Sequence, residues 1–377
     1  MIVLSNDTAK VWLIASDQSW IEGDAIRQLQ QTARLNGMFA AVGLPDLHPG
    51  KGGPVGAAFL SRNVIYPNVV GSDVGCGMGL WQTALKTRKV KRDKWAKRLR
   101  DLNLPWEGDQ REWLRRWGLD SSDYDMALGT LGGGNHFAEL QRVEQVHCRE
   151  TFLALGLDRE NFFLLVHSGS RGIGQGLLRQ HAEQFGAGGL VEGTGEMQRY
   201  MKQHDFAVQW AKANRWLIAK RICDQLNTDG RQVLDVSHNF VQKVILDGET
   251  AWLHRKGAAR SDAGPVIIPG SRGALSYLVM PVGDQQPNLW SLAHGAGRKW
   301  TRKSCRQRLK SRTRAKALTH TELGSVVICD DRELLYEEAP QAYKNIGAVI
   351  ADMAAEGCIQ VIATLRPLIT YKTRRRK

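Results

Sequence analysis

The chain contains several short apolar runs that begin or end near glycine or proline. Residues 162–166, 265–268 and 325–328 are made mostly of Phe, Leu, Val and Ile. Runs of this length that are bounded by turn-forming residues are typical of buried strands. We therefore predict strands at these three places, each next to a loop.

Elsewhere, apolar residues recur with the period of a helix. Between residues 197 and 226 the steps are seven, three, seven and four positions, along Met201, Val208, Ala211, Ile218 and Ile222. This spacing predicts one long amphipathic helix. Residues 86–117 alternate basic and apolar positions with helical spacing and are also predicted to be helical. Strands mixed with helices indicate an α+β (mixed α/β) fold. Because no repeat or linker marks a boundary, we predict one domain over residues 1–377.

The composition is that of a globular protein. Apolar residues make up 42% and charged residues 24% of the 377 positions, which excludes wholesale disorder. No run approaches 18 apolar residues, and the first ten residues lack the pattern of a signal peptide, so we expect a soluble, cytoplasmic protein. The six cysteines are scattered and never form a CxxC pair, which argues against a disulfide framework.

The charge balance points to a polyanionic partner. The chain has 52 Lys and Arg against 38 Asp and Glu, a net charge of +14. Nine basic residues lie between positions 86 and 100 and ten between positions 298 and 316, and the chain ends in a further basic run, residues 372–377. Such an excess fits nucleic acid or a membrane surface. The ordinary alternative is that each run is a solvated helix face.

Five segments combine glycines with side chains that bind metal ions or phosphate. They are residues 71–79, 129–137, 166–172, 235–240 and 293–298. Glycine permits the positive φ angles that a tight loop around a ligand needs. Taken singly, each segment has an ordinary explanation as a turn, a core histidine or a buried cysteine. Together they indicate a metal site that handles phosphate.

From residue chemistry alone, we expect this site to consist of Asp73, Cys76 and some of His136, His167 and His238. Thiolate and imidazole favour zinc, whereas carboxylate lets a harder ion such as manganese compete. Five potential ligands exceed the needs of one catalytic ion, so two adjacent ions that share a ligand fit better. Paired ions stabilise both the attacking and the leaving oxygen in phosphoryl transfer.

Phosphate groups also need donors from the protein. Backbone N–H groups of the glycine-rich loops, with Arg171 and Arg298, can hold them. No segment matches the Walker A motif, and no GxGxxG opens a Rossmann unit. The standard nucleotide-binding folds are therefore not expected.

Six segments in chain order resemble the motifs of the RtcB family of RNA-splicing ligases. They are DVGCG at residues 73–77, LGTLGGGNHF at 128–137, HSGSRG at 167–172, HN at 238–239, PGSRG at 269–273 and HGAGR at 294–298. The resemblance runs from about residue 43 to Lys372 and is nearest to a compact, second-paralogue bacterial type. It implies an RtcB-like domain with central β-sheets flanked by helices.

The resemblance also implies an activity. RtcB-type enzymes join an RNA 3′-phosphate or 2′,3′-cyclic phosphate to a 5′-hydroxyl, using GTP and manganese, in tRNA splicing or RNA repair. By similarity, His294 carries GMP as a covalent intermediate and passes it to the RNA 3′-phosphate, giving an RNA-ppG intermediate. Two manganese ions would be held by Asp73, Cys76, His136, His167 and His238, with Cys76 as the shared ligand. We expect GTP and RNA as the partners, no membrane, and a monomer.

Further contacts carry over by similarity. The guanosine-binding residues would be Asn135, His136, Phe137, Ala138, Glu139, His238, Asn239, Pro269, Gly270, Ser271, Arg272, Ser276, His294, Gly295, Ala296, Gly297, Tyr343 and Lys372. Among these, Glu139 could accept a hydrogen bond from a guanine N–H, and Gly295 and Gly297 would leave room for the nucleotide. The RNA phosphate would be gripped by Arg171, Arg298 and Arg302.

The sequence departs from the family pattern at three places. Pro49 is unusual in its segment, Arg272 stands where a smaller or apolar residue is expected, and five residues follow Lys372. We considered two other functions. A dinuclear metal phosphoesterase acting on RNA would use the same ligands but would not need His294. A non-catalytic RNA-binding protein would need only a closed structural metal site.

Overall fold

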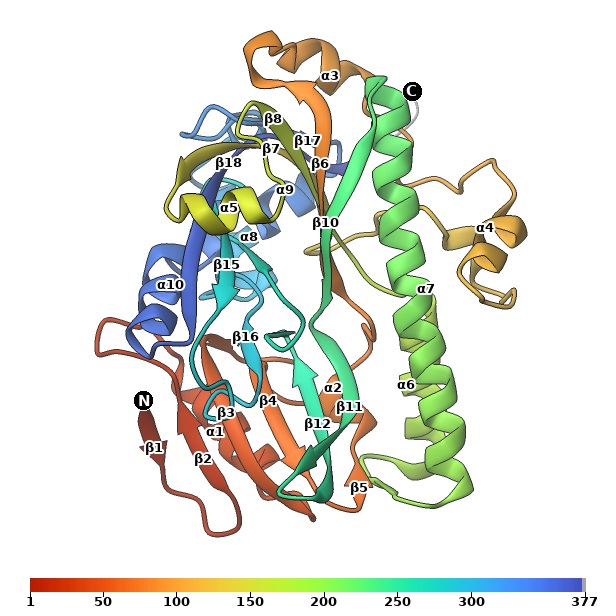
Figure 1. The fold of residues 1–377 in the computed structure, drawn as a ribbon, viewed down its shortest axis with the longest axis vertical. Helices are drawn as coiled ribbons and strands as arrows, with labels where there is room; N and C mark the ends of the chain where they lie inside the picture. Colours follow the sequence, from red (N-terminus) through yellow and green to blue (C-terminus); the bar gives the residue numbers. More distant parts are fainter. Residues whose placement is uncertain (375–377) are drawn as a thin grey trace.

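The computed structural model describes residues 1–374 and contains a six-stranded and an eight-stranded β-sheet. Figure 1 shows the six-stranded sheet in the lower half of the molecule. Its strand order is β1 (Ile2–Leu4), β2 (Lys10–Leu13), β3 (Met38–His48), β4 (Val55–Ser61), β12 (Glu249–Lys256) and β11 (Asn239–Leu246). All neighbours in it are antiparallel except β2 and β3.

The eight-stranded sheet forms the upper half in Figure 1 and carries most of the predicted motifs. Its order is β10 (Gly230–Ser237), β6 (Gly77–Lys86), β8 (Asn161–Ser168), β7 (Phe137–Val146), β18 (Ile359–Thr373), β15 (Ser276–Pro281) and β14 (Val266–Pro269), with β17 (Val326–Cys329) parallel to β18. The three predicted strands are confirmed as β8, β14 and β17. Two short pairs complete the strands: β13 (Ala258–Arg260) with β16 (Ser291–Ala293), and β5 (Val64–Ile65) with β9 (Leu190–Val191).

The two sheets are joined by the chain and by a shared apolar core. β10 passes into β11 with only His238 between them, so this path leads from one sheet directly into the other (Figure 1). The largest apolar cluster draws on both sheets, with Val42 and Leu253 from the first and Leu80 and Leu165 from the second. Burying these faces against each other is the main stabilisation available to such a fold. His238 therefore lies at the junction of the two sheets.

Helices cover the outer surfaces. They are α1 (Gly23–Thr32), α2 (Pro67–Val70), α3 (Arg92–Arg98), α4 (Gln110–Arg116), α5 (Arg149–Ala154), α6 (Gly172–Phe185), α7 (Gly195–Leu226), α8 (Arg302–Lys310), α9 (Arg332–Glu337) and α10 (Ile346–Ala355), with 3₁₀ turns η1 (Thr87–Lys89), η2 (Asp125–Ala127), η3 (Ala315–Thr319) and η4 (Pro340–Ala342). The predicted α+β class, with sheets flanked by helices, is confirmed.

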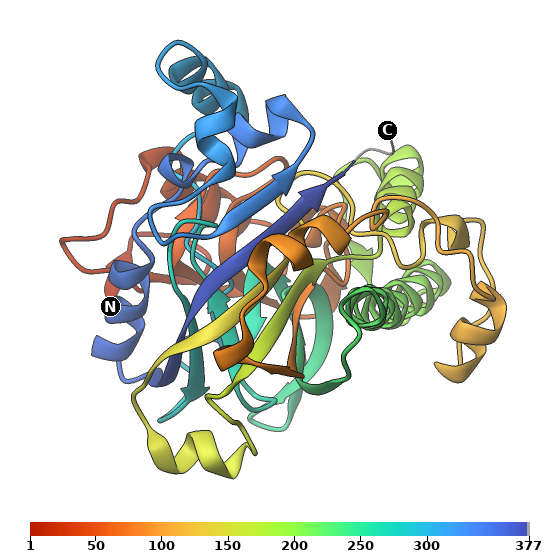
Figure 2. The same ribbon diagram turned by 90° about the horizontal axis from the view of Figure 1, so that it is seen from above.

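The long helix is also confirmed, as α7 with 32 residues. Thr194 caps its start by accepting a hydrogen bond from the Met197 N–H, and Asn227 ends it in the left-handed conformation. Ile218 and Ile222 pack into an apolar cluster with Trp81 of β6 and Leu164 of β8. Figure 2 shows α7, in green, nearly end-on beside the sheet, with the α4 region outside it.

The prediction of a helical segment over residues 86–117 is wrong in part. Only η1, α3 and α4 are helical, and the stretch between Arg98 and Gln110 is not. Pro105 lacks a backbone N–H, and Asp109 caps the start of α4 by accepting from the Glu112 N–H, so the chain restarts a helix there. Periodicity alone misses such interruptions.

Two expectations from the composition concern disulfides and membrane-spanning segments, and both can be compared with the structure of residues 1–374. All six cysteines are free. Within the described part of the chain, no helix is both long and apolar enough to cross a membrane. The extent of a single domain over residues 1–377 stays a prediction.

Candidate active site

The predicted metal ligands lie at one end of four neighbouring strands. His238 directly follows β10, Cys76 directly precedes β6, His167 lies near the end of β8, and His136 directly precedes β7. Because these strands are adjacent and antiparallel, the ends of β10 and β8 meet the starts of β6 and β7. Residues from four distant parts of the sequence are thus brought together at one end of these strands.

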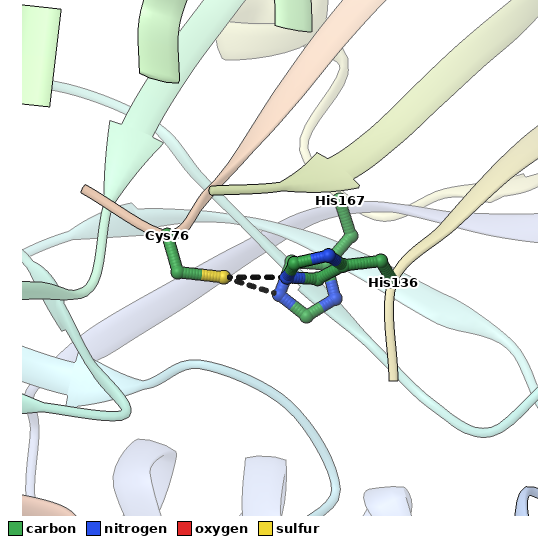
Figure 3. Close-up of side chains that lie close together, drawn as sticks. All are labelled: Cys76, His136 and His167. Atoms are coloured by element: carbon green, nitrogen blue, oxygen red, sulfur yellow. Dashed lines mark hydrogen bonds between the residues drawn. The ribbon is translucent and has the colours of Figure 1, made fainter. Parts of the chain in front are cut away.

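Cys76, His136 and His167 form a compact cluster (Figure 3). The Cys76 Sγ lies 3.4 Å from Nε2 of His136 and 3.1 Å from Nε2 of His167. These three ligand atoms all lie within 4.8 Å of one another, and all three residues are buried. Asp73 extends the cluster, since its Oδ2 lies 2.9 Å from Nε2 of His136.

His238 completes the set of five predicted ligands. Its ring centroid lies 5.2 Å from that of His167. Burial lowers the pKa of His167 and of His238 well below the ordinary value, so both imidazoles are neutral and have a lone pair to give. Nδ1 of His136 and Nδ1 of His238 have no hydrogen-bond partner among residues 1–374. A thiol, a carboxylate and three imidazoles fit a divalent transition metal.

A buried arginine braces the loops that carry two of these ligands. Arg215 of α7 donates to the carbonyl of Gly75 at 2.8 Å and to that of Ser168 at 2.9 Å. Its guanidinium also pairs with Asp235 of β10. Gly75 precedes Cys76, and Ser168 follows His167. By hydrogen bonding to both backbone segments, Arg215 fixes the distance between the Cys76 thiol and the His167 imidazole.

His294 stands next to the ligand cluster and is held by a buried carboxylate. Its ring centroid lies 4.8 Å from that of His238. Oδ2 of Asp46, a fully buried residue of β3, lies 2.7 Å from Nδ1 of His294 and also accepts from the His294 backbone N–H at 3.2 Å. The hydrogen bond to Nδ1 fixes the orientation of the ring and leaves Nε2 for a substrate.

Close packing around this pair depends on glycine. Gly297 has φ +70°, and a Cβ built on it would lie 2.2 Å from the carbonyl oxygen of Asp46. A side chain at this position would push the Asp46 backbone away from the His294 loop. The nearest neighbour of a Cβ at Gly297 would therefore be the backbone that carries Asp46. The expectation that Gly297 also leaves room for the nucleotide stays a prediction.

A cavity of about 480 Å³ adjoins the cluster and His294. Most predicted site residues line it: Asp73, Cys76, Asn135, Phe137, Glu139, His167, His238, Asn239, Pro269, Gly270, Ser271, Arg272, His294, Gly295, Ala296, Gly297, Arg298, Arg302, Tyr343 and Lys372. A cavity of this size with a few polar groups is typical of a small-molecule site.

At one side of the cavity, the buried carboxylate of Glu338 interacts with four side chains, of which three are positively charged and one is a hydroxyl. Arg298 and Arg302 lie 3.1 and 3.3 Å from its Oε1, Lys372 lies 4.0 Å from Oε2, and the Tyr343 hydroxyl donates to it. Burial alone would raise the pKa of Glu338, but Lys372, Arg298, Tyr343 and Arg302 together hold it at about 2. Two of the three arginines expected to grip phosphate, Arg298 and Arg302, are therefore paired with an internal anion.

The other departures noted in the sequence can also be placed. Lys372 is buried in β18, and its ammonium donates to the Gly134 carbonyl at 2.7 Å. Arg272 is buried, and its Nη2 donates to the Leu335 carbonyl at 2.8 Å. Pro49 lines the cavity. Of the basic tail, residues 375–377 lie outside the described residues.

Comparison with known proteins decides the family. The family model described as "tRNA-splicing ligase RtcB" matches residues 28–115 and 116–373. The chain belongs to the RtcB family of RNA ligases. The resemblance inferred from the six motifs is thereby confirmed.

Individual relatives agree over nearly the whole length. The chain is 50% identical over 366 residues to the RNA-splicing ligase RtcB2 of Escherichia coli, covering 96% of this chain and 95% of that protein. It is 29% identical over 430 residues to the RNA-splicing ligase RtcB1 of the same organism, covering 99% of each. It is 28% identical over 435 residues to the tRNA-splicing ligase RtcB of Thermococcus kodakarensis, covering 91% and 90%.

Four residues expected to bind a ligand in this RtcB chain do not line the cavity. One of them, His136, belongs to the ligand cluster. Ala138 points to the other face of β7, because neighbouring residues on a strand alternate, and it packs into the apolar cluster beside α7. Ser276 does not line the cavity, and its hydroxyl accepts a hydrogen bond from the Gln141 side chain. Arg171 lies beside the Gly132 backbone and donates to the Thr130 hydroxyl at 3.3 Å.

Motif reading also missed residues of the RtcB site. Asp46, Arg215 and Glu338 are buried charged groups whose partners come from distant segments. A sequence signal existed for Asp46, because it interrupts an otherwise apolar strand. Glu338 follows Glu337 at the end of α9, and no sequence pattern marks it as a site residue.

Glu139 of the RtcB cavity wall already accepts two internal hydrogen bonds. Gln141 Nε2 donates to its Oε1 at 2.6 Å, and the Thr370 hydroxyl donates to Oε2. Burial raises the pKa of Glu139 from its ordinary value of 4.5 to about 7, against the lowering effect of Thr370, Gln141 and Lys372. The neutral form is therefore favoured inside the protein below about pH 7.

This shift predicts a pH-dependent stability that Glu139→Gln should remove. Between pH 4.5 and 7 the folded protein holds a proton that the unfolded chain has lost, so the stability supplied by this group falls as the pH rises. The full difference is on the order of 3 kcal/mol. We compare denaturant unfolding at pH 5 and pH 7.5, without metal or GTP. The loss of unfolding free energy between these pH values should be smaller in Glu139→Gln than in wild type by about 2 kcal/mol, the part of the difference that falls in this range. An identical loss in both proteins would contradict the prediction.

Proposed function

We propose that this chain is a GTP- and manganese-dependent RNA ligase that joins an RNA 3′-phosphate or 2′,3′-cyclic phosphate to a 5′-hydroxyl. The observation that carries the proposal is the position of His294. Its ring is oriented by buried Asp46, lies 4.8 Å from the ring of His238 and borders the same cavity as Cys76. A metal-dependent phosphoesterase would have no need for an oriented imidazole beside its ligands.

In the first step, Nε2 of His294 attacks the α-phosphorus of GTP. A P–N bond forms, the bond to the bridging oxygen breaks, and pyrophosphate leaves. Asp46 accepts the Nδ1 proton in a hydrogen bond, which keeps the lone pair on Nε2 and stabilises the positive charge that develops on the ring. Nucleophilic catalysis of this kind divides one difficult reaction into easier ones.

In the later steps, an oxygen of the RNA 3′-phosphate attacks the phosphorus of the histidine-bound GMP and releases the imidazole, giving RNA-ppG. A 5′-hydroxyl then attacks the RNA phosphorus, and GMP leaves. A cyclic phosphate would first be opened by water. Two manganese ions, which when bound stabilise negative charge on the transferring phosphate, would be held by Asp73, Cys76, His136, His167 and His238.

The substrates would occupy the cavity and the basic surface beside it. Guanosine would lie against the cavity residues named above, from Asn135 to Lys372. The RNA phosphate would be bound by Arg171 and by Arg298 and Arg302, which Glu338 holds in place. Helix α8 and the segment after it, blue and at the periphery in Figure 2, carry the second basic run and would follow the RNA backbone. The enzyme would act as a cytoplasmic monomer in tRNA splicing or RNA repair.

The test is incubation with α-labelled GTP and manganese. Wild type should form an acid-labile protein–GMP adduct, and His294→Ala should form none. His147→Ala, which removes an exposed histidine, serves as the matched control and should label normally. Release of inorganic phosphate from RNA 3′ ends by a wild type that forms no adduct would overturn the proposal in favour of a dinuclear phosphoesterase.

A further inference from the structure

The Asp46–His294 pair depends on two chain segments that meet only through tertiary contacts. Asp46 belongs to the last part of β3, whereas His294 opens the loop that follows β16. No hydrogen bond within either segment fixes the distance between the carboxylate and the imidazole. The His294 backbone N–H donates directly to the Asp46 carboxylate, and one further residue contacts both segments.

That residue is Lys344, between η4 and α10. Its ammonium donates to the Leu47 carbonyl at 2.6 Å and to the Pro45 carbonyl at 3.2 Å. These two carbonyls flank Asp46 directly. The backbone N–H of Lys344 donates to the Gly297 carbonyl at 3.0 Å, three residues after His294. One residue thus holds the carboxylate segment with its side chain and the imidazole loop with its backbone.

The charge of Lys344 also suits this place. Asp46 is fully buried, and its Oδ1 has no hydrogen-bond partner among the described residues. A buried carboxylate needs compensation by a nearby positive charge or by further donors. Burial lowers the pKa of Lys344 to about 8, opposed by the nearby carboxylates Asp46, Glu22 and Asp352. The ammonium remains charged at neutral pH.

We propose that Lys344 is a positioning residue for covalent catalysis, which holds Asp46 at the distance and angle that orient His294. This inference rests on the proposed function, because it assigns a cause to the orientation of the proposed nucleophile. Lys344 does not line the cavity, although its neighbour Tyr343 does. Its effect should therefore appear in the rate of histidine modification and not in GTP binding.

The first experiment measures single-turnover formation of the GMP adduct against GTP concentration. Lys344→Met should lower the maximal rate by at least tenfold, while the GTP concentration for half-maximal rate stays within twofold. Lys344→Arg, which keeps a charged donor, should recover more of the rate than Lys344→Met. Lys202→Met, which removes an exposed lysine of α7, is the matched control and should behave as wild type. A change in GTP dependence with an unchanged maximal rate would overturn the proposal.

The second experiment is a double-mutant cycle with Asp46→Asn. If Lys344 acts through Asp46, the tenfold effect of Lys344→Met should shrink to less than threefold in the Asp46→Asn background. An undiminished effect in that background would show that Lys344 acts by another route, such as general stability, and would overturn the proposal.

A third readout separates this inference from the proposed function. Nitrogen-15 NMR of histidine-labelled protein, with His294→Ala used for assignment, should show a protected Nδ1–H in wild type that is lost in Lys344→Met. A wild type without any GMP adduct would refute the ligase chemistry, yet the NMR comparison would still test whether Lys344 positions the ring. An unchanged His294 signal in Lys344→Met would overturn the positioning role.

Discussion

Cys76→Ala is expected to abolish both GMP-adduct formation and RNA joining. The Cys76 Sγ is the atom that the cluster shares, 3.4 Å from one imidazole nitrogen and 3.1 Å from the other. Removing groups that merely orient metal ligands costs about 10–100-fold in affinity. Losing the central sulfur should therefore weaken manganese binding by at least about 100-fold, as measured by calorimetric titration of the purified protein.

The thiol must be deprotonated to act in this way. Burial, and after it the neighbouring Asp73, raises the pKa of Cys76 well above its usual value in the metal-free protein. Metal binding should therefore release a proton, and the heat of titration should depend on the ionisation enthalpy of the buffer. Cys148→Ala, at a half-buried cysteine remote from the cluster, is the matched control. Tight manganese binding and normal joining by Cys76→Ala would show that the ligand assignment is wrong.

The parts of the fold that could be predicted are those fixed by local pattern. The helix over residues 197–226 has a regular apolar face and a capping Thr194, and the structure places α7 there. The interrupted region after residue 86 shows the limit of such patterns. Its basic residues are compatible with a helix, but Pro105 and the capping Asp109 decide where helices stop and restart.

The Cys76, His136 and His167 cluster could be predicted because glycine-rich loops mark these residues in the sequence. Asp46 and Glu338 could not be assigned in that way. Their sequence neighbours do not mark either carboxylate as part of the site. Folding places Asp46 against the His294 loop and Glu338 against Arg298 and Arg302. The chemistry of a buried charge depends on partners that come from other parts of the chain.

Glu338 also changes the interpretation of the basic residues. Arg298 and Arg302 share one buried carboxylate, so they are held in place before any phosphate arrives. Fixed cations of this kind avoid the reorganisation that flexible surface arginines would need on binding. The other basic residues of α8, in contrast, are mostly exposed and suit long-range attraction of RNA. The two groups of cations are therefore expected to differ in salt sensitivity.

Asp46→Asn is expected to slow adduct formation by a factor of about 10²–10⁴. The comparable change in a serine protease, where an aspartate orients the catalytic histidine, costs about 10⁴-fold because the imidazole adopts the wrong tautomer. Here Oδ2 of Asp46 contacts both Nδ1 and the backbone N–H of His294, so an amide could keep the shape of the site while losing the charge.

The measurement is the single-turnover rate of adduct formation at saturating GTP and manganese. Asp46 lies outside the ligand cluster, so manganese affinity in Asp46→Asn should stay within about twofold of wild type. This separates the orientation of the nucleophile from the loss of metal binding expected for Cys76→Ala. Asp17→Asn, at an exposed aspartate, controls for the change of charge. A rate within threefold of wild type in Asp46→Asn would mean that His294 finds its reactive orientation without the carboxylate, and the catalytic role of the pair would have to be abandoned.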